Sequence, residues 1–537
     1  MGWLTTALIL LPLGGALLVW MFPWDAFTAG SIALLVALAE VGVWIESLVR
    51  FDFSRGGLQL DQQTNWFSDL HVSYHVGMYG FSLWLVGLTV VVQAAAIAYA
   101  FWSGRAGARA YFGLMLLLTA AIVGVFTAQD LLLFYVFWEA MLIPLYVLIG
   151  VWGGPGRLGA TIKFVIYTMA GSLLMLASVI VLGLSQGTFD LTASWQSSSD
   201  WIFLGFVAAF AVKAPLFPLH GWLPDAYRES PPEVSAVLSG VVSKAAIYGF
   251  IRIAITKFPE PTKDFRTVIL VLAAVGLVYG SLLAFRAPDI RGVIAYSSLA
   301  QIGLIMFGVF AVNDLGLNGA VLQMVNHGLI TAALFLLAGG IERRATTGEF
   351  ARLGGFARGR PILATVLMTT GIIGLAVPGS SAFAGEFAIL AGVFTRGWGY
   401  SVVGAVAIVL AAIYMLRLIS AVLHLHPGPA VAAEALDLRP AELAAIVPLL
   451  ACLLALSVWP AAITERSFTA DRAQRAIGNQ LALGHSPPIV TTSGPKTSAE
   501  LVAASHQASI ARCLETYRHA LEGGRSGHGI RAAPICR

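Results

Sequence analysis

Four ionisable side chains lie inside apolar stretches long enough to cross a bilayer. They are Glu139, Lys213, Lys244 and Glu386. An ionisable group in hydrocarbon costs roughly 2.5 to 3.5 kcal/mol on insertion scales, so such residues usually mark a path for ions or protons. Carboxylates and amines can accept and release protons. The sequence therefore predicts proton or ion translocation through a membrane.

The composition agrees with a polytopic membrane protein. Of the 537 residues, 58% are hydrophobic and 11% are charged, against about 25% charged in soluble domains. The net charge of +4 is small and indicates no nucleic-acid partner. No glycine-rich nucleotide loop opens a helix, so nothing suggests NADH or ATP binding. The three cysteines, Cys452, Cys513 and Cys536, show no metal or iron–sulfur spacing and no disulfide framework.

The first interrupted span contains Lys213. Pro215 and Pro218 follow it within two turns, and each proline removes a backbone donor and kinks a helix. Irregular backbone at bilayer depth is tolerated where it is buried or lines a hydrated cavity. Glu139 stands near the middle of another span, so burial and an ionised Glu139 would act in opposite directions on the charge of Lys213. The alternative for Glu139 is a neutral side chain that packs against a helix.

Two further titratable residues follow in the chain. Lys244 has small neighbours, including Gly240, and stands about ten positions from either end of its span, which disfavours snorkelling to the surface. His327 could relay protons because histidine titrates near neutrality, or it could be a hydrogen-bonded structural residue.

The second interrupted span carries Pro378 and Gly379, with Glu386 one or two turns later. Two broken helices, five spans apart, are typical of inverted-repeat transporters.

Windows of about 20 apolar residues predict an all-α fold with about fourteen transmembrane helices. The expected spans lie near 2–21, 28–49, 78–101, 110–128, 130–150, 161–184, 200–217, 232–255, 267–285, 290–310, 315–340, 361–390, 398–424 and 441–461. The first span shows no features of a removed signal peptide. Most loop arginines fall on one side of this topology, and such loops stay in the cytoplasm. Both termini are therefore expected on the outer side.

Five regions follow from these spans. Residues 1–109 hold N-terminal helices and an outer loop, 110–255 a first repeat, 256–424 a second repeat, and 425–461 a last helix. Residues 462–537 form a tail without a span, rich in Ser, Ala, Arg and His, which is typical of a linker or disordered segment. The tail contains one amphipathic stretch at 498–521.

Several motifs resemble the subunit M family of proton-pumping NADH:quinone oxidoreductase (complex I). They occur in the family's order over about residues 78–460: FYVFWEAMLIPLYVLIGVWGG, KAPLFPLHGWLPDAY, IAYSSLAQIG, GLNGAVLQMVNHGLITAALFLLAGGIERR and VPGSSAFAGEF. Related antiporter-like subunits usually carry lysine in the second broken helix, where the M type has an acid. Glu386 stands there in this chain.

The resemblance implies a fold and a set of roles. The fold has fourteen spans, two inverted five-helix repeats, each with a broken helix, and both termini outside. By position, Glu139 and Lys213 match a pair in the entry half-channel, Lys244 the central lysine, and His327 the histidine of a connecting polar axis. Glu386 matches the terminal acid of the exit half-channel. The helix breaks are expected at Pro215, Pro218, Pro378 and Gly379.

The resemblance also implies the surroundings of the chain. It would be a non-redox proton-translocating subunit in a prokaryotic plasma membrane, beside other complex I membrane subunits, especially the related antiporter-like ones. NADH, FMN, iron–sulfur clusters and quinone are expected on partner subunits, and no cofactor or metal on this chain. The alternatives are an Mrp-type Na⁺/H⁺ antiporter subunit and a scaffold without ion flux.

The chain departs from the family pattern at four positions. Tyr79 replaces an acid of the third span, Tyr227 and Arg228 alter the segment after the first broken helix, and Ala345 replaces a histidine. These changes concern side contacts of the predicted path and leave its axial charges in place. The tail has no recognised counterpart.

Overall fold

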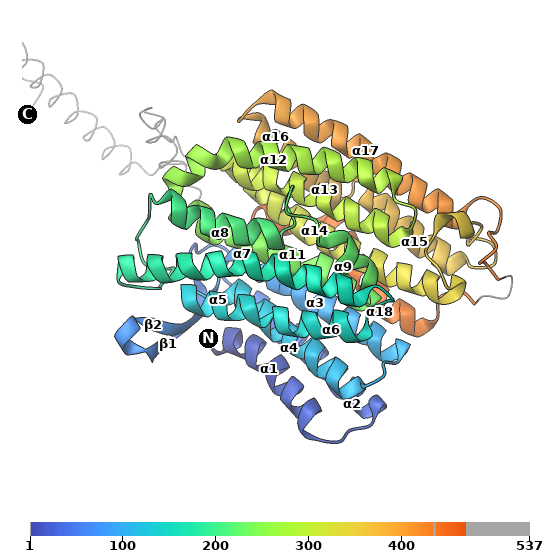
Figure 1. Cartoon of the computed structure of the whole chain (residues 1–537), viewed down its shortest axis with the longest axis horizontal. Coiled ribbons are helices and arrows are strands. Elements are labelled where there is room, and N and C mark those ends of the chain that lie inside the picture. Colours follow the sequence, from blue (N-terminus) through green and yellow to red (C-terminus); the bar gives the residue numbers. More distant parts are fainter. Residues whose placement is uncertain (1, 433–435, 469–537) are drawn as a thin grey trace, which may run out of the picture. The chain divides into compact units, whose positions relative to one another are not determined.

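The computed structural model describes residues 2–432 and 436–468. Cys513, Cys536 and the predicted amphipathic stretch 498–521 lie outside the described residues. The described residues all belong to one compact unit, and its long helices run side by side in Figure 1. Twelve helical segments in the described residues are long and apolar enough to cross a membrane. The prediction of a mostly helical, polytopic membrane protein is thus confirmed.

The N-terminal part of the chain contains six long helical segments and one hairpin. Its helices are α1 (Trp3–Met21), α2 (Ala26–Arg50), α3 (Gly80–Ser103), α4 (Ala108–Thr127), α5 (Leu131–Ala140), α6 (Leu142–Trp152) and α7 (Arg157–Gln186). Helices α5 and α6 together form one apolar segment, Leu131–Trp152.

The middle of the chain contains shorter pieces. They are α8 (Asp200–Lys213), α9 (Leu223–Glu229), α10 (Pro232–Val237), η2 (Leu238–Val242), α11 (Ser243–Gly249) and η3 (Phe250–Ile255). Both η2 and η3 are π-helical. The segment from α10 to η3 is continuous, and its apolar window is buried throughout. π-Helical turns are rare and frequently occur at functional sites. This segment carries Lys244 at its centre.

The C-terminal part contains α12 (Pro259–Arg286), α13 (Ile290–Ala311), α14 (Asp314–Ala345), α15 (Pro361–Gly374), α16 (Ser381–Phe394), α17 (Trp398–Leu423), α18 (Pro440–Val458) and the short α19 (Ala461–Thr464). Helix α14 is buried along its whole apolar window. It packs against α13 and α16, and it therefore places its polar side chains in the interior.

A two-stranded antiparallel sheet occupies a segment that sequence reasoning treated as loop. Strands β1 (Gln59–Phe67) and β2 (Val72–Met78) pair, with Gln62 opposite Val76 and Asn65 opposite Ser73. We call this end of the helix bundle the hairpin end. The opposite end, where Arg105, Arg228 and Arg291 lie, is the arginine end.

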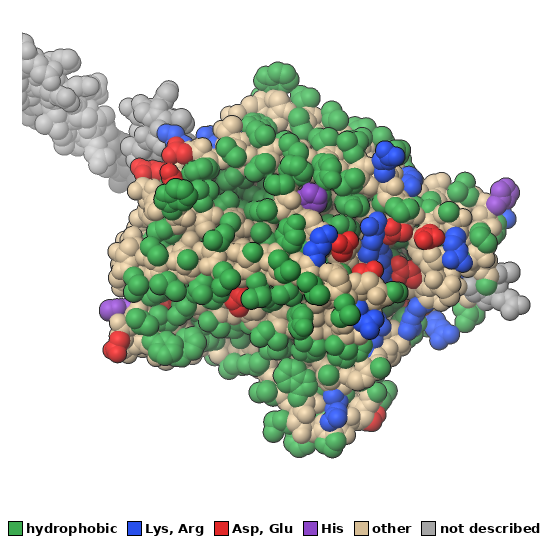
Figure 2. All heavy atoms as spheres, viewed as in Figure 1, with side chains coloured by type: hydrophobic (Ala, Val, Ile, Leu, Met, Phe, Trp, Pro, Cys, Tyr) green, Lys and Arg blue, Asp and Glu red, His purple; other side chains and the backbone are tan. Residues whose placement is uncertain are grey.

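The two ends differ in charge. On the face seen in Figure 2 the side chains over the helices are mostly hydrophobic, while basic and acidic side chains gather toward the end where α9 and α15 are labelled in Figure 1. These charges are paired across elements, for example Arg228 with Asp289 at 2.9 Å and Arg291 with Glu342 at 2.6 Å. Such pairs join the ends of helices that are far apart in the sequence.

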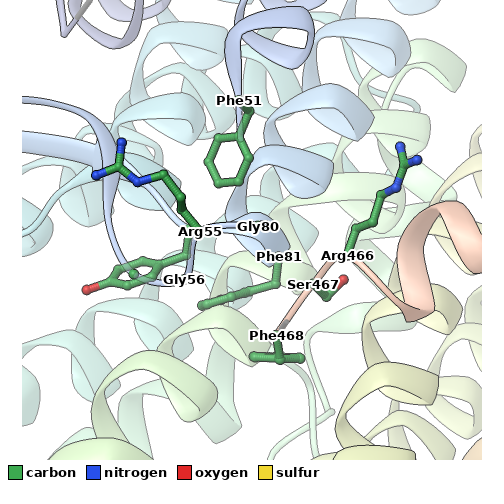
Figure 3. A pocket seen from close by; sticks show the side chains of 10 residues that line it. Phe51, Arg55, Gly56, Gly80, Phe81, Arg466, Ser467 and Phe468 are labelled. Atoms are coloured by element: carbon green, nitrogen blue, oxygen red, sulfur yellow. The ribbon is translucent and has the colours of Figure 1, made fainter. Parts of the chain in front are cut away.

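A small pocket lies at the hairpin end. Phe51, Arg55, Phe81, Arg466 and Phe468 are among the side chains that line it (Figure 3). The rings of Phe81 and Phe468 stack at 5.1 Å.

Candidate functional site

Four of the five residues predicted to carry protons are buried. The exposed fraction is 4% for Lys213, 0% for Lys244, 4% for His327 and 3% for Glu386. Glu139 is half-buried. Burying an ionisable group without a partner is expensive, so the contacts of these four side chains decide what they can do.

Lys213 ends helix α8, and the chain then turns before α9. Pro215 and Pro218 both lie in this turn. The carbonyl of Val212, near the helix end, accepts a hydrogen bond from the Trp222 indole nitrogen at 2.9 Å. A buried helix end is tolerated when its free backbone groups find such partners. The break thus positions the Lys213 side chain at the terminus of a helix, beside non-helical backbone.

The Lys213 ammonium contacts Trp138 of α5. Its Nζ donates to the Trp138 carbonyl at 3.0 Å and stands 3.8 Å from the centre of the indole ring. Glu139 is the next residue in α5, but no ion pair joins it to Lys213 in the described structure. A cation over an aromatic face is stabilised electrostatically. The direct contact of the Lys213 ammonium in α5 is therefore Trp138, and an effect of Glu139 on its charge stays a prediction.

Lys244 and His327 are in direct contact. The distance from Lys244 Nζ to His327 Nδ1 is 2.7 Å, and Lys244 Nζ also donates to the Ser239 carbonyl at 2.6 Å. The two residues are 83 positions apart in the sequence and come from α11 and α14. A short contact between two nitrogen bases lets one proton pass between them, because only one of the two facing atoms needs to carry it.

Glu386 is held by two glutamines. Its Oε1 accepts a hydrogen bond from Gln301 Nε2 at 2.9 Å and from Gln323 Nε2 at 3.3 Å, and Gln323 Nε2 also donates to Gln301 Oε1 at 2.9 Å. Hydrogen bonds from neutral donors stabilise an ionised carboxylate. Helices α13 and α14 therefore supply the donors for a carboxyl group on α16.

The second helix break precedes Glu386. Helix α15 ends at Gly374 and α16 begins at Ser381, with Ser380 Oγ accepting from the Phe383 amide at 3.2 Å. Pro378 and Gly379 lie between them. Gly379 has φ +97°, in the left-handed region that favours glycine. The interruption places Glu386 in the second turn of a new helix, inside the bundle.

Several buried polar atoms between the Lys244–His327 contact and Glu386 have no hydrogen-bond partner among the described residues. On α14 they include Gln323 Oε1, both side-chain polar atoms of Asn326, and His327 Nε2, and on α16 Glu386 Oε2. Gln323, Asn326 and His327 are spaced three, four and one positions apart, so they share one region of the α14 surface. The atoms extend from the Lys244 contact toward Glu386.

The four departures from the family pattern also have defined places. The hydroxyl of Tyr79 accepts a hydrogen bond from Arg252 at 3.1 Å, and Tyr227 donates weakly to the Leu238 carbonyl at 3.4 Å. Arg228 pairs with Asp289, and Ala345 is the buried last residue of α14. None of these contacts involves the five predicted residues.

Sequence reasoning missed five residues of interest. Trp138, Gln301, Gln323 and Asn326 are neutral, so the cost of a charge in hydrocarbon could not reveal them. Glu40 in α2 was recognisable by that same rule: its side chain is 1% exposed and its Oε1 has no partner among the described residues. No three His, Cys, Asp or Glu side chains in the described part of the chain lie together as metal ligands would.

Comparison with known proteins identifies the family. Residues 128–413 match the model described as NADH:quinone oxidoreductase/Mrp antiporter, TM. NADH-quinone oxidoreductase subunit M of Rickettsia prowazekii is 33% identical over 466 residues, which is 85% of this chain and 95% of that protein.

Two solved structures share the fold. A chain of respiratory complex I from Thermus thermophilus has a TM-score of 0.80 and 30% identity, covering 88% of this chain and 99% of that one. A chain of the Mrp complex from Dietzia sp. has a TM-score of 0.78 at 23% identity, covering 87% and 96%. This chain belongs to the NADH:quinone oxidoreductase/Mrp antiporter transmembrane family, with relatives named NADH-quinone oxidoreductase subunit M.

Proposed function

We propose that this chain is the M-type membrane subunit of a proton-pumping NADH:quinone oxidoreductase and that it moves protons along its buried charges. The observation that carries the proposal is the 2.7 Å contact between Lys244 and His327, two buried bases on helices from the predicted first and second repeats. A proton can pass from one repeat to the other through this contact.

The proposed topology has fourteen spans. Twelve of these spans are the long apolar helices. The other two are broken helices, one made of α8 with α9 and one of α15 with α16. Each broken span belongs to one of two inverted five-helix repeats within 110–255 and 256–424. Arginine-rich loops remain in the cytoplasm, so the arginine end is the inner side, the hairpin end is the outer side, and both termini are outside.

The proposed path starts in the first repeat and ends in the second. Glu139 and Lys213 form the entry, and the charge of Lys213 responds to Glu139 and to the Trp138 ring. Lys244 receives the proton and passes it to His327. From His327 the proton travels along Asn326 and Gln323, whose free polar atoms could be bridged by water, to Glu386. It leaves from Glu386 on the outer side.

The energies involved are of matching size. Moving one charge against 100 mV costs about 2.3 kcal/mol, and one hydrogen bond to a charged group contributes about 1.5–3 kcal/mol. Making or breaking one contact of Lys213 or Glu386 is therefore enough to drive a step. Partner subunits, including the related antiporter-like ones, would carry NADH, FMN, iron–sulfur clusters and quinone, and this chain would perform no redox chemistry.

An Mrp-type antiporter subunit is the alternative function. The likeness to the Mrp chain, at 23% identity, concerns the fold alone. The relatives named subunit M and the complex I chain at 30% identity favour the oxidoreductase. An antiporter would exchange Na⁺ for protons without electron transfer.

The test is proton pumping in inverted membrane vesicles that carry Lys244→Ala, with NADH oxidation followed in parallel. We expect pumping and coupled turnover to fall together while the complex assembles. Lys163→Ala is the matched control, because Lys163 is 43% exposed and paired with Asp225. Unchanged pumping, or the selective loss of Na⁺-driven proton exchange, would refute the proposal.

A further inference from the structure

Arg252 is a buried arginine that has no acidic partner. It lies on η3 at the hairpin end, is 7% exposed, and forms no ion pair with any described residue. Its guanidinium donates to Gln129 Oε1 at 2.9 Å, the Leu191 carbonyl at 3.0 Å and the Tyr79 hydroxyl at 3.1 Å. All three acceptors are neutral, and the guanidinium also lies 4.8 Å from the centre of the Tyr79 ring, so no negatively charged group among the described residues pairs with it.

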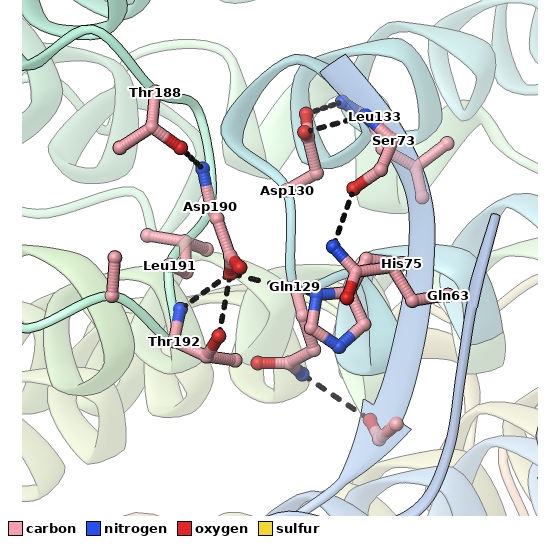
Figure 4. A network of polar contacts seen from close by, with 12 residues as sticks. Gln63, Ser73, His75, Gln129, Asp130, Leu133, Thr188, Asp190, Leu191 and Thr192 are labelled. Atoms are coloured by element: carbon pink, nitrogen blue, oxygen red, sulfur yellow. Dashed lines mark hydrogen bonds and ion pairs between the residues drawn. The ribbon is translucent and has the colours of Figure 1, made fainter. Parts of the chain in front are cut away.

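The residues around Arg252 are held in place by hydrogen bonds to the hairpin. Figure 4 shows the hairpin strand β2 beside the segments that carry Gln129, Asp130 and Asp190. Asp130 Oδ2 accepts from the Ser73 amide at 3.1 Å, and Gln129 Nε2 donates to the Gly77 carbonyl at 3.2 Å. Gln129 is therefore oriented with its carbonyl oxygen toward Arg252.

The carboxylate of Asp190, which precedes Leu191 in the chain, has other partners. Asp190 Oδ1 accepts from both the amide and the hydroxyl of Thr192 at 2.7 Å and lies 3.5 Å from His75 Nδ1. Burial opposes ionisation, but the contacts with His75 and Thr192 lower the pKa of Asp190 to about 2. Asp190 is 24% exposed. Solvent therefore reaches a residue adjacent in sequence to Leu191, whose carbonyl binds Arg252.

Toward the interior, Arg252 is close to the proposed proton path. Lys244, Tyr248 and Arg252 are spaced four positions apart, so they lie roughly on one face of the same helical segment. The Tyr248 hydroxyl is buried without a hydrogen-bond partner among the described residues, and its ring contacts Phe81 and Phe126, each at 5.4 Å. A proton on Lys244 is thus about two helical turns from Arg252.

We propose that Arg252 is an electrostatic seal, which prevents protons on Lys244 from exchanging with the outer side through Tyr248. This inference rests on the proposed function. A fixed arginine charge excludes protons and other cations from a pore. At an effective dielectric constant of about 20, a second unit charge about 6 Å away is disfavoured about a hundredfold. Protons are therefore directed to His327.

The ammonium group of Lys257 is affected by the positive charge of Arg252. Burial and, next, the positive charge of Arg252 lower the pKa of Lys257 to about 8. Lys257 follows the membrane span and donates to the Ala193 carbonyl at 2.5 Å. The field of Arg252 thus acts on an ammonium group that lies beyond the end of η3, toward the outer surface.

The test is passive proton leak in liposomes that contain the intact complex, measured without NADH as the decay of an imposed pH gradient. We expect Arg252→Gln to raise the leak at least tenfold and Arg252→Lys, which keeps the charge, to leave it unchanged. Lys257→Gln is the matched control that removes a nearby charge outside the span. Adding Lys244→Met to Arg252→Gln should abolish the leak, because it removes the inner proton carrier.

Gln129→Glu provides a second variant if Arg252→Gln does not assemble. It keeps the side-chain shape and places a carboxylate on the guanidinium, so we expect a raised leak. An assembled Arg252→Gln or Gln129→Glu complex with wild-type leak would overturn the seal, as would a leak that persists in the double variant. Failure of the proposed function is distinguished by Lys244→Ala, which would then leave pumping intact.

Discussion

Replacing Gln301 with leucine should slow proton release from Glu386. The substitution removes the 2.9 Å hydrogen bond to Glu386 Oε1 and the acceptor for Gln323. Leucine is similar in volume, so the helices α13 and α16 should pack as before. Gln323 keeps its longer 3.3 Å contact with Glu386. The effect should therefore be mainly electrostatic.

The magnitude follows from the lost contact. A hydrogen bond to a charged group contributes about 1.5–3 kcal/mol, and we take the lower value because Gln323 remains. The negative charge that forms when Glu386 releases its proton is then less favourable by about a factor of ten, since about 1.4 kcal/mol changes a rate or equilibrium constant tenfold. Proton pumping and coupled NADH oxidation should both fall about tenfold.

The assay is pumping in inverted vesicles with the amount of assembled complex measured in parallel. Gln301→His keeps an N–H donor and should retain most of the activity. Gln93→Leu is the matched control, because Gln93 is also buried and both its amide atoms lack hydrogen-bond partners among the described residues. Wild-type pumping by an assembled Gln301→Leu complex would refute the role of this hydrogen bond.

Three further predictions concern other contacts. Trp138→Leu removes a ring 3.8 Å from the Lys213 ammonium. This contact contributes about 2 kcal/mol when desolvated, so pumping in vesicles should fall about thirtyfold, and Trp138→Phe should retain more. Arg344→Met removes the ion-pair partner of Glu442, whose side chain is 0% exposed. Leaving this buried carboxylate without its partner costs about 3–5 kcal/mol of stability, so the yield of assembled complex should drop, and adding Glu442→Leu should restore it. Asp190→Asn should lower the free energy of unfolding of the purified protein by about 1–2 kcal/mol, measured by thermal denaturation. Because the pKa of Asp190 is lowered from 3.8 to about 2, this difference should be present above pH 4 and disappear as the pH falls toward 2.

Much of the fold was predictable from local properties of the sequence. Apolar length indicated the spans, and Pro215, Pro218, Pro378 and Gly379 predicted where two of them are interrupted. The buried positions of Lys213, Lys244, His327 and Glu386 agree with charges placed within apolar stretches. These inferences need no knowledge of which helices are neighbours.

The partners of these charges were decided by tertiary structure. The sequence suggested Glu139 as the partner of Lys213, yet the ammonium contacts Trp138. Whether Glu139 acts on Lys213 during turnover stays a prediction. The hairpin β1–β2 was also missed, because its strand β1 is polar and largely exposed, so it lacks the alternation that marks a buried strand.

The sequence by itself determined that this protein crosses a membrane, carries titratable groups within it and breaks two of its helices. Only the tertiary structure placed Lys244 against His327, Gln301 and Gln323 against Glu386, and Arg252 among neutral acceptors. The physical reason is that hydrophobicity and backbone breaks are properties of local segments of the chain, so the sequence of each segment is enough to reveal them. Contacts between side chains depend on how each helix is rotated and where it crosses its neighbours, which is settled by packing among residues far apart in sequence.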